Sequence, residues 1–261
     1  MKVVLFCGGE GLRFRESAET VLKPMAPIGY RPILWHVMKY YAHYGHKEFI
    51  LCLGFRGDII KNFFRNCDET LTNNFVIRSG QGIELLGRDT HDWKITLLET
   101  GARASVGQRL LAARPYIDPD EMFLANYSDG LTDAPLDEMI RRLESSNDTA
   151  CFLAVRPNLS YHFVQMDETG HVRDIRNVSD SEMRINGGYF VFRREIFDYI
   201  RPGEDLVPEP FKRVLAAGKL MSYEHDGFWA SMDTFKDRQR LWELSDRGEA
   251  PWQIWRNGSP L

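Results

Sequence analysis

The sequence has few cysteines and no excess of positive charge, and each shortage argues against a class of protein. The four cysteines lack CxxC spacing, and three stand in apolar stretches, so we expect buried thiols rather than a zinc site or a disulfide framework. Against 33 basic residues there are 37 acidic ones, and the formal net charge of −4 gives no sign of a nucleic-acid-binding surface. The charges are therefore interpreted as an ordinary solvated surface.

Long hydrophobic runs are also missing. The chain begins MKVVLFCGG, where a single lysine precedes an apolar run that is too short for a signal peptide or a membrane span. We therefore expect a cytoplasmic protein that does not contact a membrane. The 261 residues are enough to bury a sizeable core and fit one large domain, because no linker, repeat or low-complexity segment divides them.

In the first half of the chain, short apolar runs alternate with stretches whose apolar residues recur at helical spacing. We expect strands at residues 3–6, 47–53, 94–98 and 121–126, and helices at residues 32–44, 58–65, 106–113 and 135–143. Strands that alternate with helices at these distances are typical of βαβ units. The pattern predicts an α/β fold with a mostly parallel central sheet flanked by helices.

The second half is richer in strands and has shorter connections. We expect strands at residues 149–155, 162–166, 172–175, 188–192 and 219–223, and helices at residues 209–217 and 234–246. This half is predicted to be mixed or antiparallel and to share one continuous sheet with the first half.

One glycine-rich stretch, LFCGGEGLRFRE, follows the first predicted strand. A glycine turn at this place lets the backbone approach a phosphate closely. The stretch lacks the third glycine of a dinucleotide fingerprint and the Lys-Ser or Lys-Thr of a P-loop. It does offer Arg13, and Lys23 follows, so the stretch has cations suited to a triphosphate. From these residues alone, a triphosphate site and an ordinary strand-to-helix turn both remain open.

Longer blocks carry a family resemblance. GGEGLRF followed by LKPMAPIGYRPILWHVM resembles the start of the sugar-1-phosphate nucleotidyltransferases. The blocks LGFRGDIIKNFF, TGARASVGQRL, FLANYSDGLTD, INGGYFVF, YEHDGFWASMDT and APWQIW resemble the glucose-1-phosphate cytidylyltransferase branch, so the similarity runs from residue 2 to residue 255. The resemblance implies a Rossmann-like nucleotidyltransferase fold in one domain, residues 1–261. Residues 1–134 would bind the nucleotide, and residues 135–261 would form a smaller β-rich part for the sugar phosphate and the C-terminal helix.

The resemblance also implies an activity. Members of the family condense a nucleoside triphosphate with a sugar 1-phosphate to give a nucleoside diphosphate sugar and pyrophosphate, with Mg²⁺ as cofactor. The sugar phosphate oxygen attacks the α-phosphorus in line, and the protein contributes positioning and charge neutralisation. Within the branch, CTP is favoured over UTP, dTTP and GTP. Because family members are commonly oligomers, we expect a homo-oligomer.

The family's functional residues map onto positions of this sequence. The catalytic residues implied are Arg13, Lys23 and Asp129, and Asp129 with Asp233 would ligate Mg²⁺. The nucleotide-binding residues implied are Leu5, Gly8, Gly9, Gly11, Leu12, Arg13, Lys23, Thr100, Gly101, Gly107 and Arg109. The residues implied for the sugar phosphate are Arg176, Asn186, Gly187 and Trp229.

Two departures from the family pattern bear on the substrates. Leu12 stands where the family has a threonine, which removes a hydroxyl but keeps the backbone N–H, so we expect weakened or re-routed phosphate binding. The family's Glu-Lys-Pro, whose lysine grips the sugar phosphate, is absent from VRDIRNVSDSEMRINGG. An arginine of this segment is expected to replace the lysine: Arg173, Arg176 or Arg184, with Arg176 favoured.

These departures leave alternatives open. The acceptor is a sugar 1-phosphate such as glucose 1-phosphate, or else a phosphorylated polyol, a cyclitol or a phosphonate. A non-catalytic relative that binds nucleotide without turnover is a second possibility. A glycosyltransferase is disfavoured because Tyr127-Ser128-Asp129 is not an Asp-x-Asp motif. Two further interpretations concern packing: His36 is expected in the core, and the tail tryptophans cover either their own core or a subunit interface.

Overall fold

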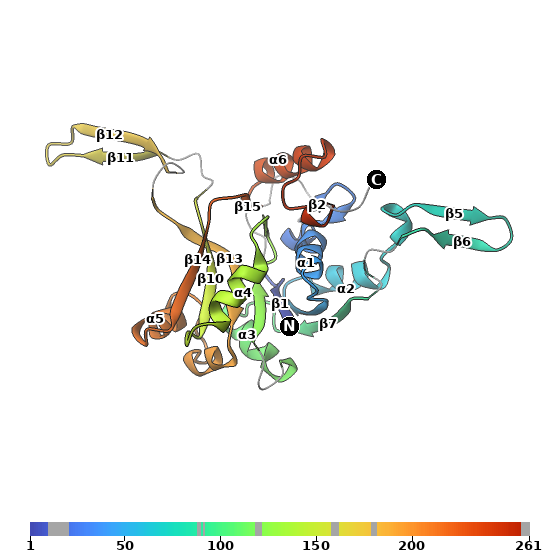
Figure 1. Cartoon of the computed structure of the whole chain (residues 1–261), viewed down its shortest axis with the longest axis horizontal. Coiled ribbons are helices and arrows are strands. Elements are labelled where there is room, and N and C mark those ends of the chain that lie inside the picture. The colour runs from blue at the N-terminus through green and yellow to red at the C-terminus, as the bar shows by residue number, and fades with distance from the viewer. Residues whose placement is uncertain are drawn as a thin grey trace.

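A seven-stranded sheet forms the centre of the molecule (Figure 1). The structure is a computed structural model that describes residues 1–9, 21–87, 90, 92–117, 122–157, 162–178 and 182–256. The strand order is β14-β10-β13-β8-β1-β4-β7. Within this sheet β13 runs antiparallel to both of its neighbours, and every other pair of neighbours is parallel. The strands are β1 (Lys2–Phe6), β4 (Glu48–Leu53), β7 (Lys94–Glu99), β8 (Phe123–Asn126), β10 (Ala150–Val155), β13 (Ile185–Phe192) and β14 (Leu220–His225).

Helices cover both faces of this sheet, and each face has its own apolar core. The first core lies under α1 (Ile33–His43), α2 (Gly57–Arg65), α4 (Leu136–Glu144) and α6 (Phe235–Asp246). The second core lies under α3 (Val106–Ala113), α5 (Glu209–Ala216) and the 3₁₀ segment Arg194–Tyr199. Successive strand residues point to opposite faces, so Val3 and Leu5 of β1 enter the first core while Val4 and Phe6 enter the second.

Short pieces complete the fold around the sheet. β2 (Pro27–Ile28) pairs with β3 (Arg31–Pro32), and β9 (Gly130–Thr132) pairs with β15 (Trp229–Ser231). Besides Arg194–Tyr199, the described residues form 3₁₀ turns at Lys23–Met25, Glu69–Leu71, Arg114–Tyr116 and Ile254–Arg256. A capping box at Thr234 starts α6, because the Thr234 and Asp237 side chains each accept a backbone N–H of the other residue. Among the described residues, no helix is both long and apolar enough to cross a membrane.

Two hairpins stand apart from the sheet, and we call them the first and the second arm. β5 (Phe75–Arg78) and β6 (Gly82–Leu85) form the first arm, and β11 (His162–Met166) and β12 (Val172–Asn177) form the second. The arms project from opposite ends of the long axis (Figure 1). One face of each arm is apolar and exposed, made of Phe75, Ile77 and Ile83 in the first arm and of Val164, Met166, Val172 and Ile175 in the second.

The structure confirms the α/β fold class and the mostly parallel sheet. The predicted strands and helices are present, with ends that differ by a few residues; β13, for example, begins at Ile185 rather than at residue 188. The prediction missed the first arm and the β9–β15 pair. The turn of the first arm, SGQG, is not one of the short hairpin signals, and three-residue strands are too short to show a period.

Two smaller predictions also hold. Cys7, Cys52 and Cys151 are buried free thiols, and burial raises the pKa of Cys7 and of Cys151 to about 12. His36 is buried in α1 and hydrogen-bonded within the core. Of the three tail tryptophans, Trp252 is fully buried in the first core and Trp255 packs against it, so these two cover their own chain, whereas Trp242 is 41% exposed.

Candidate active site

Lys23, Asp129 and Asp233 meet at one edge of the sheet. The Nζ atom of Lys23 lies 2.6 Å from Oδ2 of Asp129 and 2.7 Å from Oδ1 of Asp233. In the sequence, Asp129 follows Lys23 by 106 positions and Asp233 follows it by 210 positions. The structure therefore brings together the lysine and the two carboxylates that the sequence predicted as catalytic and metal-binding residues.

The β9–β15 pair explains why the two aspartates are neighbours. Gly130 of β9 pairs with Ser231 of β15, and the N–H of Met232 donates to the carbonyl of Asp129 at 2.8 Å. Asp233 is the next residue, and its carboxylate also accepts the Ser231 hydroxyl at 2.7 Å. The short ribbon that the sequence analysis missed thus sets the distance between the two carboxylates.

A strained turn presents Asp129. Ser128 is buried and has φ of 67°, a left-handed conformation that is uncommon for residues other than glycine. Its N–H donates to Oδ1 of Asn126 at 2.6 Å, which holds the turn directly after β8. Strain of this kind persists where the surrounding structure enforces it and concentrates at functional sites.

The two neighbouring carboxylates keep the side chain of Lys23 positively charged. Burial acts to lower the pKa of its ammonium, but the charges and hydrogen bonds of Asp129 and Asp233 outweigh that effect and raise the pKa above its ordinary value. Lys23 is therefore protonated at neutral pH and neutralises part of the charge of the two carboxylates.

A pocket of about 480 Å³ opens beside these residues, and we call it the glycine-turn pocket. Five predicted site residues line it: Gly8, Gly9, Lys23, Arg109 and Asp129. The other lining residues are Phe6, Pro24, Ala102, Arg103, Ala104, Ser105, Val106, Tyr127 and Asp205. Of these, Arg103 stands out because it has no carboxylate partner within the described part of the chain. The block TGARAS offered a signal for it, an arginine two residues after the predicted Gly101.

Four other residues predicted to bind the nucleotide do not line this pocket themselves. Leu5 is fully buried in the first core, and Thr100 bonds to the backbone of Leu53 with its hydroxyl at 2.6 Å. Gly101 has a positive φ of 98° at the turn after β7. A Cβ atom at Gly107 would lie 2.8 Å from the Glu204 carbonyl, so that glycine allows α3 to pack closely on the segment before α5. Gly11, Leu12 and Arg13 lie outside the described residues.

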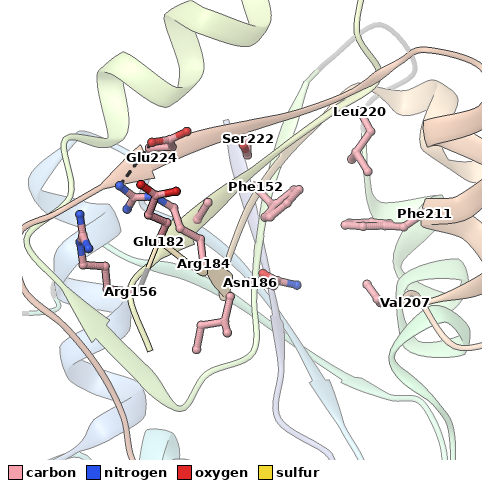
Figure 2. Close-up of a pocket in the computed structure, with 12 residues that line it drawn as sticks. Phe152, Arg156, Glu182, Arg184, Asn186, Val207, Phe211, Leu220, Ser222 and Glu224 are labelled. Carbon is pink, nitrogen blue, oxygen red and sulfur yellow. Dashed lines mark ion pairs between the residues drawn. The ribbon is translucent and has the colours of Figure 1, made fainter. Parts of the chain in front are cut away.

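A second pocket, of about 680 Å³, lies on the α5 side of the sheet (Figure 2). Its apolar wall is made of Phe152, Val207, Phe211 and Leu220, and its charged rim is made of Arg156, Glu182, Arg184 and Glu224. Figure 2 shows these two groups on opposite sides of the cavity, with Asn186 near the centre. The two pockets are neighbours, because Asp205 lines the first and Val207 lines the second.

The structure separates Arg176 from the other residues predicted for the sugar phosphate, Asn186, Gly187 and Trp229. Asn186 lines the second pocket, and its Oδ1 accepts the N–H of Gly188 at 2.9 Å. Trp229 lines neither pocket, packs against the first core and donates its indole N–H to the carbonyl of Gly187 at 2.8 Å. Arg176 lies on the second arm, where it forms an ion pair with Asp174. Arg184 is the arginine of its segment that reaches the second pocket, where it pairs with Glu224 and Asp226.

Comparison with known proteins defines the class of this chain. Residues 2–237 match the family model described as nucleotidyl transferase. The chain therefore belongs to the nucleotidyl transferase family, which confirms the resemblance found in the sequence.

Curated relatives narrow the similarity. The chain is 36% identical over 258 residues to a probable glucose-1-phosphate cytidylyltransferase of Bacillus subtilis (strain 168), covering 98% of this chain and 100% of that protein. It is 34% identical over 257 residues to glucose-1-phosphate cytidylyltransferase of Salmonella typhi, with the same coverage.

Solved structures share the fold. A putative glucose-1-phosphate thymidylyltransferase from Bacillus anthracis, crystallised with sucrose, superposes with a TM-score of 0.66 at 15% identity over 94% of each chain. HddC from Yersinia pseudotuberculosis in complex with GMP-PN gives a TM-score of 0.63 at 18% identity, over 94% of this chain and 99% of that one.

Proposed function

We propose that this protein transfers a cytidylyl group from CTP to the phosphate of a sugar 1-phosphate and releases pyrophosphate. The observation that carries the proposal is the placement of Lys23 between Asp129 and Asp233 at the glycine-turn pocket. Membership of the nucleotidyl transferase family and the relatives named as glucose-1-phosphate cytidylyltransferases support the reaction and the choice of CTP.

The reaction needs charge neutralisation more than acid–base chemistry. An oxygen of the acceptor phosphate forms a bond to the α-phosphorus, and the bond from that phosphorus to the bridging oxygen of pyrophosphate breaks. The ammonium of Lys23 offsets negative charge where the acceptor phosphate and the α-phosphate meet. Gly8 and Gly9 leave the turn without side chains, so the triphosphate can approach its backbone.

Asp129 and Asp233 fit a divalent cation, for which we propose Mg²⁺. Both carboxylates already share one positive charge, the Nζ atom of Lys23, and carboxylate oxygens are the ligands that Mg²⁺ prefers. Two protein ligands suffice because phosphate oxygens and water complete its coordination. When bound, the cation supplies neutralisation of triphosphate charge.

We place the acceptor, including its phosphate, in the second pocket. Asn186 and Arg184 line it, and it adjoins the glycine-turn pocket through the segment from Asp205 to Val207. Arg184 is the better candidate to replace the family's missing lysine, because Arg176 stands on the projecting second arm. An incoming phosphate would exchange with Glu224 and Asp226, whose side chains are both well exposed.

The test is pyrophosphate release with Mg²⁺, measured for CTP, UTP, dTTP, GTP and ATP against sugar 1-phosphates, polyol phosphates and phosphonates. We expect a signal with CTP and glucose 1-phosphate or a related acceptor. Asp129→Ala should lower the rate by at least about 100-fold, since transition-state charge loses its support. Asp198→Ala, a change of an exposed aspartate outside both pockets, serves as the control.

Each other outcome has a definite meaning. Appreciable turnover by the Asp129 variant contradicts the role of that carboxylate. Nucleotide binding without turnover across the whole panel favours the non-catalytic alternative. A signal with a phosphonate or a polyol phosphate only would move the acceptor class away from sugars.

We also propose that the protein is a homo-oligomer held together by its two arms. A two-stranded hairpin is marginally stable by itself, and each arm exposes an apolar face. The arms of one chain project from opposite ends of the molecule, so a second copy is the surface that can cover them (Figure 1).

A further inference from the structure

We propose that Arg109 is a positioning residue that binds the glycine turn to the carboxyl ends of the two neighbouring strands. In this role Arg109 holds the backbone of the glycine turn, which receives the triphosphate, in a fixed position relative to Thr100. The inference rests on the proposed function, in which the glycine turn receives the triphosphate, but it assigns Arg109 a role through the backbone of this chain. The family resemblance implied direct contact with the nucleotide instead.

The guanidinium of Arg109 joins three strands. Nη2 donates to the carbonyl of Gly8 at 2.8 Å, just beyond β1. Nη1 donates to the carbonyl of Leu53 at 3.0 Å, the last residue of β4, and to the hydroxyl of Thr100 at 2.6 Å, just beyond β7. Because β1, β4 and β7 are adjacent in the sheet, one planar group fixes the spacing of all three strand ends.

Two glycines are required by this arrangement. A Cβ atom at Gly8 would lie 2.1 Å from Cζ of Arg109, and a Cβ atom at Gly54 would lie 2.7 Å from Nη1. Real Cβ atoms do not approach other atoms so closely. Gly8 is therefore needed to admit the guanidinium, in addition to leaving room for a phosphate.

The hydrogen bond to Gly8 also orients the next peptide group. In a trans peptide the C=O and the following N–H point in opposite directions. Holding the carbonyl of Gly8 on Arg109 therefore turns the N–H of Gly9 away from the guanidinium. Gly9 is exposed and lines the glycine-turn pocket, so its N–H is available to a phosphate oxygen.

The charge of Arg109 is a second, separate feature. The residue is 3% exposed, and within the described part of the chain no carboxylate forms an ion pair with it. Burial lowers the pKa of its guanidinium, which expresses the cost of a buried cation. Because Arg109 lines the glycine-turn pocket, a bound triphosphate would supply the opposite charge. Substitutions at Arg109 can therefore separate the effect of its planar hydrogen-bonding group from the effect of its charge.

Steady-state kinetics of three variants separates these contributions. Arg109→Lys keeps the charge but loses the planar fork, so we expect kcat to fall about 10- to 100-fold with little change in KM for CTP. Arg109→Met loses both, so KM for CTP should rise as well. Arg114→Met is the matched control, an exposed arginine just beyond α3 whose guanidinium lies 5.4 Å from the Phe197 ring centroid. Thermal melts check that each variant folds.

A double-mutant cycle tests the close approach without reference to activity. Gly8→Ala should lower the melting temperature of the wild-type chain by several degrees, because the new methyl group meets the guanidinium. In the Arg109→Met background the same change should cost clearly less. Equal costs in both backgrounds would overturn the proposal.

The kinetic outcomes are equally decisive. Wild-type kcat in Arg109→Lys contradicts the positioning role. If Arg109→Lys instead raises KM for CTP at unchanged kcat, Arg109 acts as a direct triphosphate contact. If the wild-type protein itself neither binds nor turns over a nucleotide, the proposed function has failed, and the melting cycle alone then decides whether Arg109 holds the turn.

Discussion

At the scale of single residues, Lys23 holds the position that a cation takes between two carboxylates. Its Nζ atom contacts both Asp129 and Asp233 at hydrogen-bonding distance. A divalent cation that uses the same two carboxylates must compete with this ammonium. Binding of the cation would then release Lys23 toward the phosphates of the substrates.

The first prediction concerns Lys23→Met, which removes the competing charge and keeps much of the side-chain volume. We expect loss of turnover together with a rise of roughly tenfold in the affinity of the nucleotide-free protein for Mn²⁺ or Mg²⁺, because a neighbouring positive charge is gone. Isothermal titration calorimetry without nucleotide measures this, and Lys61→Met, on the surface next to Glu99, is the control. Unchanged or weaker metal binding would show that the ammonium does not occupy the place of the cation.

At the scale of elements, α1 is joined to β2 and to the C-terminal segment through His36. Its Nε2 lies 3.1 Å from the carbonyl of Ile28, and its Nδ1 accepts the indole N–H of Trp252 at 3.3 Å. Nε2 therefore carries the proton of the neutral ring, and a second proton on Nδ1 would face the indole N–H. Burial, with Arg256 and Arg31 adding to its effect, lowers the pKa of His36 to about 4.

The sign of the resulting pH dependence follows directly. The unfolded chain binds a proton at His36 near pH 6.5, and the folded chain binds it only near pH 4. The free energy of unfolding therefore keeps its full value above pH 6.5 and decreases as the pH falls toward 4. One such group contributes a slope of about 1.4 kcal/mol per pH unit in this range. His36→Gln, which can keep one donor and one acceptor, should flatten the slope by about that amount in urea unfolding.

A second histidine, His46, also contributes to the pH dependence of the free energy of unfolding. Burial and the N-terminal amine also lower the pKa of His46 to about 4, so part of the slope should remain in the His36 variant. His46→Gln is therefore the informative companion variant. A slope that is the same in His36→Gln and in the wild type would contradict the neutral, buried state of His36.

At the scale of the whole molecule, the arms present apolar surface that one chain does not cover. Ile77 is 70% exposed in the first arm and Ile175 is 60% exposed in the second. The opposite face of each arm carries an ion pair, Arg78 with Glu84 and Arg176 with Asp174, beside one exposed apolar side chain, Val76 or Phe163. A hairpin with charged side chains on one face only is typical of a strand pair that is buried on the other face.

The assembly prediction uses this difference between the two faces. Ile77→Asp or Ile175→Asp places a charge on the apolar face and should reduce the mass measured by light scattering after size-exclusion chromatography to that of a smaller species. Val76→Asp is the matched control, because Val76 is on the same strand as Ile77 but on the opposite face, which carries the ion pair of Arg78 with Glu84. A wild-type protein that is monomeric, or an oligomer that survives both substitutions, contradicts assembly through the arms.

Local pattern was enough to predict the strand and helix alternation and the buried cysteines, whereas the residues of the candidate site were predicted from the family resemblance. Apolar spacing reports which face of an element is buried, and β1, β4, α1 and α3 each show that spacing over a full element. Residue type and order alone leave a triphosphate site and an ordinary turn both open for GGEGLRF, and the catalytic role of Lys23 in LKPM is implied by the family resemblance.

Only the folded chain decided which of these residues meet. Asp129 and Asp233 become neighbours through the β9–β15 ribbon, whose strands are too short to leave a period in the sequence. The same limit hid the partners of Arg109, which come from the ends of three strands. Arg184 reaches the second pocket while Arg176 stands on an arm, although eight positions of one arginine-rich segment separate them. Contacts between distant segments depend on how strands pair and helices pack, and local spacing carries no information about either.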